Sequence, residues 1–160
     1  MDSYLENIRV LVVDDQGFIR RIVCQMLDVI GAKDVSEAVD GSDAWKKFEE
    51  CESDLIIADW EMKPTSGLEF VKRIRNDEAS PNPYVPIIML TGYSEIERVE
   101  VARDSGINEF VAKPISAKAL YNKIISVIEN PRQFIRTVTY FGPSRRRQDI
   151  AVENERRDVG

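Results

Sequence analysis

The stretch VLVVDDQGF at residues 10–18 decides the fold, because an unbroken aliphatic run ends in two adjacent aspartates, Asp14 and Asp15. A short, continuous apolar run is typical of a strand that is buried on both faces, as in a parallel sheet. Two carboxylates at the end of such a strand repel one another. We therefore expect groups elsewhere in the fold to neutralise them.

Short apolar runs alternate along the chain with segments of helical periodicity. The expected strands are 8–13, 33–38, 54–58, 86–90 and 108–112. Apolar residues at three- and four-residue steps predict a first helix over 19–30, and Gly31 is placed to end it. Serines suited to capping begin three later helices, at Ser66, Ser94 and Ser116. Five strand-then-helix units over residues 8–130 predict an α/β fold, a doubly wound parallel sheet with helices on both faces.

Polar residues stand at the ends of four of these strands. They are Asp14 and Asp15 after the first strand, Asp59 after the third, Thr91 and Gly92 after the fourth, and Lys113 after the fifth. Open parallel sheets bind ligands beyond the carboxyl ends of their strands, so these residues are expected to share one edge. A lone aspartate there is more commonly a turn or cap residue. Three carboxylates beside a lysine instead favour a hypothesis of a Mg²⁺ site.

Composition excludes several classes of protein. The net charge of −6 argues against a general nucleic-acid binder, which usually presents a basic face. No run of 18 uncharged apolar residues occurs, and the N-terminal MDSYLEN lacks the pattern of a secretion signal, so we expect a cytoplasmic protein without membrane insertion. Cys24 and Cys51 have no histidine or second cysteine at ligand spacing, which supports neither a zinc site nor a disulfide.

The strand-end motifs resemble a known family, the receiver domains of two-component response regulators, and most of all the stand-alone chemotaxis receivers. The motifs are VVDD at 12–15, IIADWEM at 56–62 with Gly67 eight positions after Asp59, MLTGY at 89–93 and FVAKP at 110–114. The resemblance covers roughly residues 7–130, and we take residues 1–130 as one receiver domain. It implies a flavodoxin-like fold with strand order 2-1-3-4-5, and a signalling protein rather than an enzyme.

The resemblance also implies roles for individual residues. Asp59 would accept the phosphoryl group. Asp15, Asp59 and the main-chain carbonyl of Glu61 would hold Mg²⁺, with Asp14 acting largely through a metal-bound water. Lys113 would neutralise charge on the phosphoryl oxygens, an arrangement aided by the cis Lys113-Pro114 peptide that the family has.

The remaining implied roles concern the response to phosphorylation. Thr91 would hydrogen-bond a phosphoryl oxygen, with Gly92 contributing a backbone contact, and Phe110 would turn its ring inward. A core phenylalanine is the alternative reading of Phe110. The expected output surface is the face formed by the helix after Ser94, the strand 108–112 and the helix 117–129.

Partners follow from the same resemblance. A sensor histidine kinase or a histidine phosphotransfer protein would donate the phosphoryl group. An unknown output protein would bind the receiver, which is expected to be a monomer or a weak homodimer.

One alternative function is a phosphate shuttle or sink that passes its phosphoryl group to a histidine phosphotransfer protein. A haloacid-dehalogenase-type phosphatase fits less well, because that family needs a second aspartate two residues after its nucleophile, where this chain has Glu61.

Three positions depart from the family pattern. Lys63 stands where a proline often occurs, with Pro64 one residue later, which leaves the shape of this loop open. Glu61 and Tyr93 occupy positions that tune the access of water to the phosphoaspartate, and the sequence gives no lifetime for that group.

Residues 131–160 form a C-terminal extension beyond the resemblance. They hold 7 basic and 4 acidic residues, whereas residues 1–130 hold 15 and 24, so the sign of the charge changes. Aromatic and β-branched residues at 134–141 predict order up to about 143, packed near the face to which Thr91 and Phe110 respond or against a second copy. The polar end, from 148 onward, is expected to be disordered.

Overall fold

The computed structural model describes residues 3–63, 65–92, 106–130, 133–137 and 140–144. Its strands are β1 (Arg9–Val13), β2 (Asp34–Ala38), β3 (Leu55–Asp59), β4 (Ile87–Thr91), β5 (Glu109–Ala112), β6 (Phe134–Arg136) and β7 (Phe141–Pro143). Its helices are the 3-10 helix η1 (Ser3–Asn7), then α1 (Gly17–Ile30), α2 (Gly41–Glu50), α3 (Gly67–Asn76) and α5 (Ala117–Glu129). The helix expected after Ser94 lies outside the described residues.

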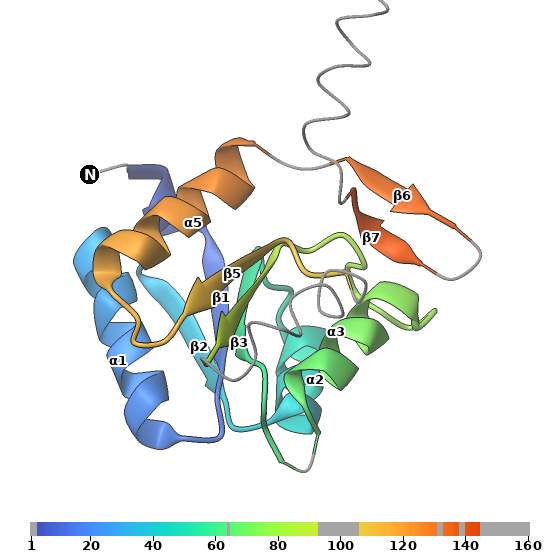
Figure 1. The fold of residues 1–160 in the computed structure, drawn as a ribbon, viewed down its shortest axis with the longest axis horizontal. Coiled ribbons are helices and arrows are strands. Elements are labelled where there is room, and N and C mark those ends of the chain that lie inside the picture. The colour runs from blue at the N-terminus through green and yellow to red at the C-terminus, as the bar shows by residue number, and fades with distance from the viewer. Residues whose placement is uncertain (1–2, 64, 93–105, 131–132, 138–139, 145–160) are drawn as a thin grey trace, which may run out of the picture.

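The first five strands form one parallel sheet in the order β2-β1-β3-β4-β5, as the resemblance implied. The central strands β3 and β4 are buried at every position, which explains their continuous apolar sequence. Helices α1 and α5 cover one face of the sheet, and α2 and α3 cover the other (Figure 1).

The helix ends agree with the capping residues expected from the sequence. Gly31 closes α1 in the left-handed conformation with φ of 106°. Ser66 and Ser116 accept backbone hydrogen bonds from Glu69 and Ala119, and so cap α3 and α5. None of the helices in the described residues combines the length and the apolarity that a bilayer crossing requires.

The C-terminal extension contributes an antiparallel hairpin of β6 and β7 that packs beside α3 (Figure 1). Phe134 and Phe141 of the hairpin meet the ring of Tyr84, with centroids 5.2 and 5.5 Å away. Arg75 of α3 stacks on Phe134, 4.9 Å from its ring centroid.

The packing of the extension was predicted, but its place was wrong. Tyr84 lies in the loop that leads into β4, so the hairpin sits beyond the amino end of that strand, whereas Thr91 ends β4 at the opposite edge. Proximity along the chain favours the nearest face, whereas the aromatic contacts with Tyr84 and the buried Arg75 determine where the hairpin docks. The arginines 145–147 and the end of the extension lie outside the described residues.

Candidate functional site

The register of the sheet brings the predicted strand-end residues to one edge. Val13 of β1 lies beside Ala58 of β3, so Asp14 and Asp59 emerge next to each other. On the other side of β3, Asp59 pairs with Leu90. Thr91 then pairs with Ala112, one residue before Lys113. The ends of four strands thus bring polar residues to a single edge of the sheet, two of them (Asp14 and Asp15) from β1.

Asp14, Asp15 and Asp59 form a cluster in which one carboxylate oxygen from each lies within 4.8 Å of the others. Asp14 is fully buried and Asp59 is 5% exposed, whereas Asp15 is exposed. Asp14 Oδ1 accepts a hydrogen bond from the Gln16 N–H at 2.8 Å. Its other oxygen, Oδ2, is buried and has no hydrogen-bond partner within the described part of the chain. An orphaned carboxylate oxygen is costly unless a cation or water meets it.

Lys113 supplies a positive charge to this cluster. Its Nζ donates to Asp59 Oδ1 at 2.8 Å, and the same oxygen accepts the Trp60 N–H at 3.0 Å. The Lys113-Pro114 peptide is cis, as the resemblance implied. Thr91 is 4% exposed at the end of β4. The predicted lysine and nucleophile candidate are therefore in direct contact.

Burial dominates the protonation of the two inner carboxyls. It raises the pKa of Asp59 to about 6, and the negative charge of Asp14 adds to that effect, while Lys113 and the Trp60 N–H oppose it. Burial likewise raises the pKa of Asp14, opposed mainly by the Gln16 N–H. Near pH 7.5 Asp59 is ionised, but its negative charge is destabilising in the folded protein, because the site is buried and lies beside Asp14.

Gly67 allows the chain after β3 to fold back over the cluster. Its N–H donates to the Trp60 carbonyl at 3.0 Å. A Cβ atom at this position would lie 2.1 Å from the main-chain oxygen of Asp59, which no side chain tolerates. The glycine noted eight positions after Asp59 is therefore required by close backbone approach.

The other predicted site residues occupy less central places. Glu61 is exposed and lines a shallow pocket with Asp15, Gln16 and Trp60, beside the cluster. Phe110 is half-buried and packs against the core on the α2 and α3 side of the sheet. Gly92 directly follows β4, and Tyr93 lies outside the described residues.

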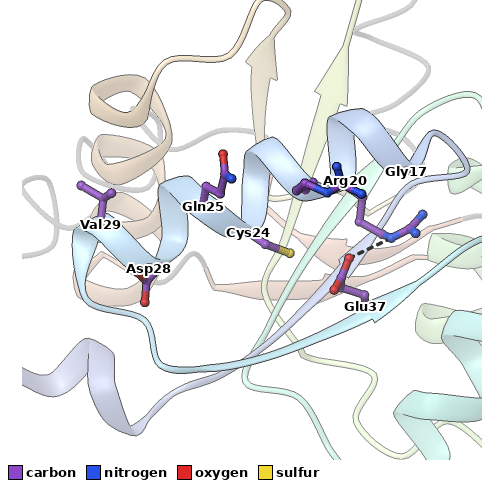
Figure 2. A pocket seen from close by; sticks show the side chains of 8 residues that line it. Gly17, Arg20, Cys24, Gln25, Asp28, Val29 and Glu37 are labelled. Atoms are coloured by element: carbon purple, nitrogen blue, oxygen red, sulfur yellow. Dashed lines mark hydrogen bonds and ion pairs between the residues drawn. The ribbon is translucent and has the colours of Figure 1, made fainter.

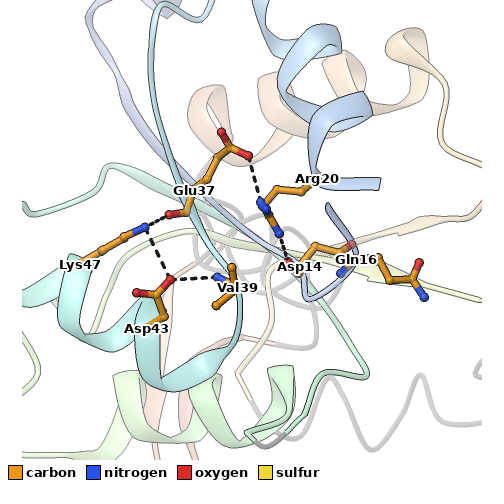
Figure 3. A network of polar contacts seen from close by, with 7 residues as sticks. All are labelled: Asp14, Gln16, Arg20, Glu37, Val39, Asp43 and Lys47. Carbon is orange, nitrogen blue, oxygen red and sulfur yellow. Dashed lines mark hydrogen bonds and ion pairs between the residues drawn. The ribbon is translucent and has the colours of Figure 1, made fainter. Parts of the chain in front are cut away.

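Sequence reasoning missed Arg20, which the structure connects to the cluster (Figure 3). Its Nη1 donates to the main-chain carbonyl of Asp14 at 2.7 Å, and its Nε pairs with Glu37 at 2.9 Å. A basic residue on an amphipathic helix normally indicates only a solvated face, so no sequence signal pointed to this contact.

Comparison with known families gives the same assignment as the strand-end geometry. The family of response regulator receiver domains matches residues 10–125, which include every residue of the cluster and Lys113. The chain belongs to the response regulator receiver family. Receiver domains are signalling modules of two-component systems rather than conventional enzymes, and they typically bind Mg²⁺ through an acidic pocket such as the one formed by Asp14, Asp15 and Asp59.

Chemotaxis receivers are among the curated relatives and the solved structures to which this chain is similar. Chemotaxis protein CheY1 of Helicobacter pylori is 35% identical over 121 residues, which cover 75% of this chain and 96% of the relative. Chemotaxis protein CheY-3 of Vibrio cholerae is 32% identical over 124 residues, covering 78% and 94%. The structure of Vibrio cholerae CheY4 superposes with a TM-score of 0.69 at 32% identity, over 76% of this receiver chain and 98% of that one.

Proposed function

We propose that this receiver is a phosphoacceptor that takes a phosphoryl group on Asp59 from a histidine kinase or a histidine phosphotransfer protein. The contact between Lys113 Nζ and Asp59 Oδ1 at 2.8 Å carries the proposal. It joins a buried carboxylate to a cation at the edge where parallel sheets bind ligands. Asp59 is the member of the cluster that the lysine reaches through a hydrogen bond.

The residues at this edge fit a divalent cation. Asp14 Oδ2 is buried without a partner among the described residues, and three carboxylates converge within 4.8 Å. Oxygen ligands of this kind are those that Mg²⁺ prefers. Asp15, Asp59 and the main-chain carbonyl of Glu61 would hold the ion, and Asp14 would act largely through a bound water. When bound, Mg²⁺ offsets the negative charge of the phosphoryl oxygens.

The chain's own groups account for the transfer. An ionised Asp59 oxygen forms the new bond to phosphorus while the bond from phosphorus to the donor nitrogen breaks, and the electron pair stays on the imidazole. No general base is required, because the nucleophile is already an anion. Lys113 balances charge on the transferred group, in a site where burial strengthens electrostatic interactions.

We further propose that the phosphoryl group changes the binding of an output protein. Thr91 is buried at the end of β4, next to Leu90, which pairs with Asp59. In this proposal its hydroxyl donates to a phosphoryl oxygen on Asp59. Phe110 of β5 is half-buried and pairs with Met89 of β4, two residues before Thr91, and it would follow by turning inward. The output face would then be the one formed by residues 94–105, β5 and α5.

Phosphorylation is tested by incubating the protein with acetyl phosphate and MgCl₂ and measuring its intact mass. We expect one labile phosphoryl group on the unaltered chain and none on Asp59→Asn. The matched control is Asp54→Asn, because Asp54 precedes the same strand at its opposite end, where it accepts a hydrogen bond from Arg9. Equal labelling of Asp59→Asn and the unaltered chain would contradict the assignment.

Magnesium is expected to stabilise the fold, because it relieves the repulsion among the three carboxylates and binds the native state only. At a hundredfold excess over its dissociation constant the gain is about 2.7 kcal/mol. Trp60 is 3% exposed and follows Asp59 directly, so its fluorescence should report the titration. Asp15→Asn is expected to weaken the response more than Asp14→Asn does. An unchanged melting temperature and emission at millimolar Mg²⁺ would refute the metal site.

A further inference from the structure

Arg20 connects three parts of the fold at the edge of the cluster (Figure 3). It belongs to the first part of α1, its Nη1 donates to the Asp14 carbonyl at 2.7 Å, and its Nε donates to Glu37 of β2 at 2.9 Å. The arginine side chain is only 19% exposed. Both hydrogen bonds use the fork geometry of a guanidinium, which can hold two acceptors in fixed directions.

The carbonyl that Arg20 holds belongs to the peptide joining Asp14 to Asp15. On the other side of Asp14, its N–H donates to the Ala38 carbonyl at 3.1 Å. The turn is therefore held by β2 at one peptide and by Arg20 at the next. Asp15 itself is exposed, so the direction of its side chain depends on how this backbone is fixed.

The strand that anchors Arg20 is itself held in place. Lys47 of α2 donates to the Glu37 main-chain carbonyl and pairs with Asp43 at 3.5 Å. Asp43 in turn accepts the Val39 N–H at 3.0 Å. Arg20 thus links the turn of the cluster to a strand end that is tied to α2, rather than to a free surface carboxylate.

Arg20 and Glu37 line an open groove along α1 together with Cys24 and Gln25 (Figure 2). The groove that holds the Arg20–Glu37 pair is also lined by Arg21, which is exposed. Burial raises the pKa of Cys24 to about 11, so the thiol stays neutral at physiological pH. Asp28 also lines the groove, but it pairs with Lys33 at 3.3 Å. Glu37 is therefore the acidic partner that holds the guanidinium in position.

We infer that Arg20 is a positioning residue for the metal site, because it holds the Asp14 carbonyl so that the carboxylates of Asp14 and Asp15 face Asp59. This inference rests on the proposed Mg²⁺ binding. If Arg20 acted only through its positive charge, it would oppose Mg²⁺ binding, because two cations repel each other. Removal of Arg20 would then tighten Mg²⁺ binding, whereas the loss of positioning weakens it.

The direction of the change in Mg²⁺ affinity is measured by titrating MgCl₂ into the full chain at 20 °C and following Trp60 fluorescence. Arg20→Gln is expected to weaken Mg²⁺ binding about tenfold, the usual effect of losing a group that orients a ligand. Arg21→Gln is the matched control, because it removes the same charge from the exposed neighbouring position. Thermal unfolding of each variant in EDTA shows whether the variant is folded. If the role of Arg20 is merely structural, Arg20→Gln has a lower melting temperature, but the folded variant binds Mg²⁺ with unchanged affinity.

Arg20→Lys keeps the charge but not the two-armed fork, so it decides the question if Arg20→Gln does not fold. Weaker binding by Arg20→Lys supports positioning, and binding equal to that of the unaltered chain overturns it. An Arg20→Gln affinity equal to or above that of Arg21→Gln also overturns the inference. If the unaltered chain and Arg21→Gln show no Mg²⁺ response, the proposed metal site fails, and the inference fails with it.

Discussion

Replacing Asp59 with asparagine is expected to stabilise the metal-free protein by about 2 to 3 kcal/mol at pH 7.5, although it removes the proposed nucleophile. Burial and the charge of Asp14 raise the pKa of Asp59 from 3.8 to about 6. Each pKa unit corresponds to about 1.4 kcal/mol of preference for the neutral form. An asparagine of the same shape does not carry the charge that the folded protein holds unfavourably.

The effect should depend on pH with a defined sign. Because the pKa is higher in the folded state, the unfolded chain loses its proton first as the pH rises. The contribution of Asp59 to stability is therefore complete below about pH 4 and lost as the pH passes about 6. Urea unfolding in EDTA should show the advantage of Asp59→Asn at pH 7.5 and a smaller one at pH 5. Saturating Mg²⁺ should reduce the difference in free energy of unfolding between Asp59→Asn and the unaltered chain.

Asp28→Asn is the control for this comparison, because the Asp28 side chain is 74% exposed in α1. We expect it to change the free energy of unfolding by less than about 0.5 kcal/mol at either pH. If Asp59→Asn is no more stable than the unaltered chain at pH 7.5, the buried charge is compensated by its partners, and our account of the cluster is wrong.

Much of the site could be predicted from the sequence because it lies at strand ends. The apolar runs fix where β1, β3, β4 and β5 stop, and a parallel sheet places all four ends at one edge. The residues that follow these strands, from Asp14 to Lys113, are therefore neighbours however the surrounding side chains pack. The contact of Lys113 with Asp59 requires only this topology and a long side chain.

The supporting residues could not be predicted in the same way. Arg20 and Arg75 look like ordinary basic residues on amphipathic helices, and their partners depend on which loops approach those helices in three dimensions. Arg75 bonds to Gly106, 31 residues away, and to Asn108, 33 residues away. The docking place of the β6–β7 hairpin was mispredicted for the same reason, since the ring of Phe134 rests on Arg75.

Arg75 occupies the centre of the contacts that hold this second region together. It is 1% exposed, and burial lowers its pKa to about 9, so it remains charged at neutral pH. Its guanidinium donates to the carbonyls of Pro83 and Gly106 at 2.8 and 2.9 Å and to Asn108 Oδ1 at 2.9 Å. These bonds join α3 to the loop before β4 and to the turn before β5, and Phe134 adds the hairpin.

Arg75→Met is expected to lower the free energy of unfolding by about 2 to 4 kcal/mol. The methionine fills much of the volume, but it leaves the buried Gly106 carbonyl and the part-buried Pro83 carbonyl without their donor. Asn108 Oδ1 keeps a hydrogen bond from the Ile87 N–H. Each buried group that loses its partner costs about 1 to 3 kcal/mol. The loss exceeds the gain from no longer burying a charge, because the acceptors are held by backbone that cannot turn to water. Urea unfolding followed by circular dichroism measures the effect.

Arg73→Met provides the comparison within the same helix. Arg73 is 49% exposed, stacks on Trp45 with its Cζ 3.9 Å from the ring centroid, and pairs with Asp77 at 3.4 Å. Exposed contacts of this kind contribute less than about 1 kcal/mol each, so this variant should lose little stability. If Arg75→Met costs no more than Arg73→Met, the guanidinium of Arg75 does not hold the hairpin side of the domain together. If its larger cost shrinks when the chain is cut after Asn130, the hairpin contributes to it, because the arginine then lies against water instead of Phe134.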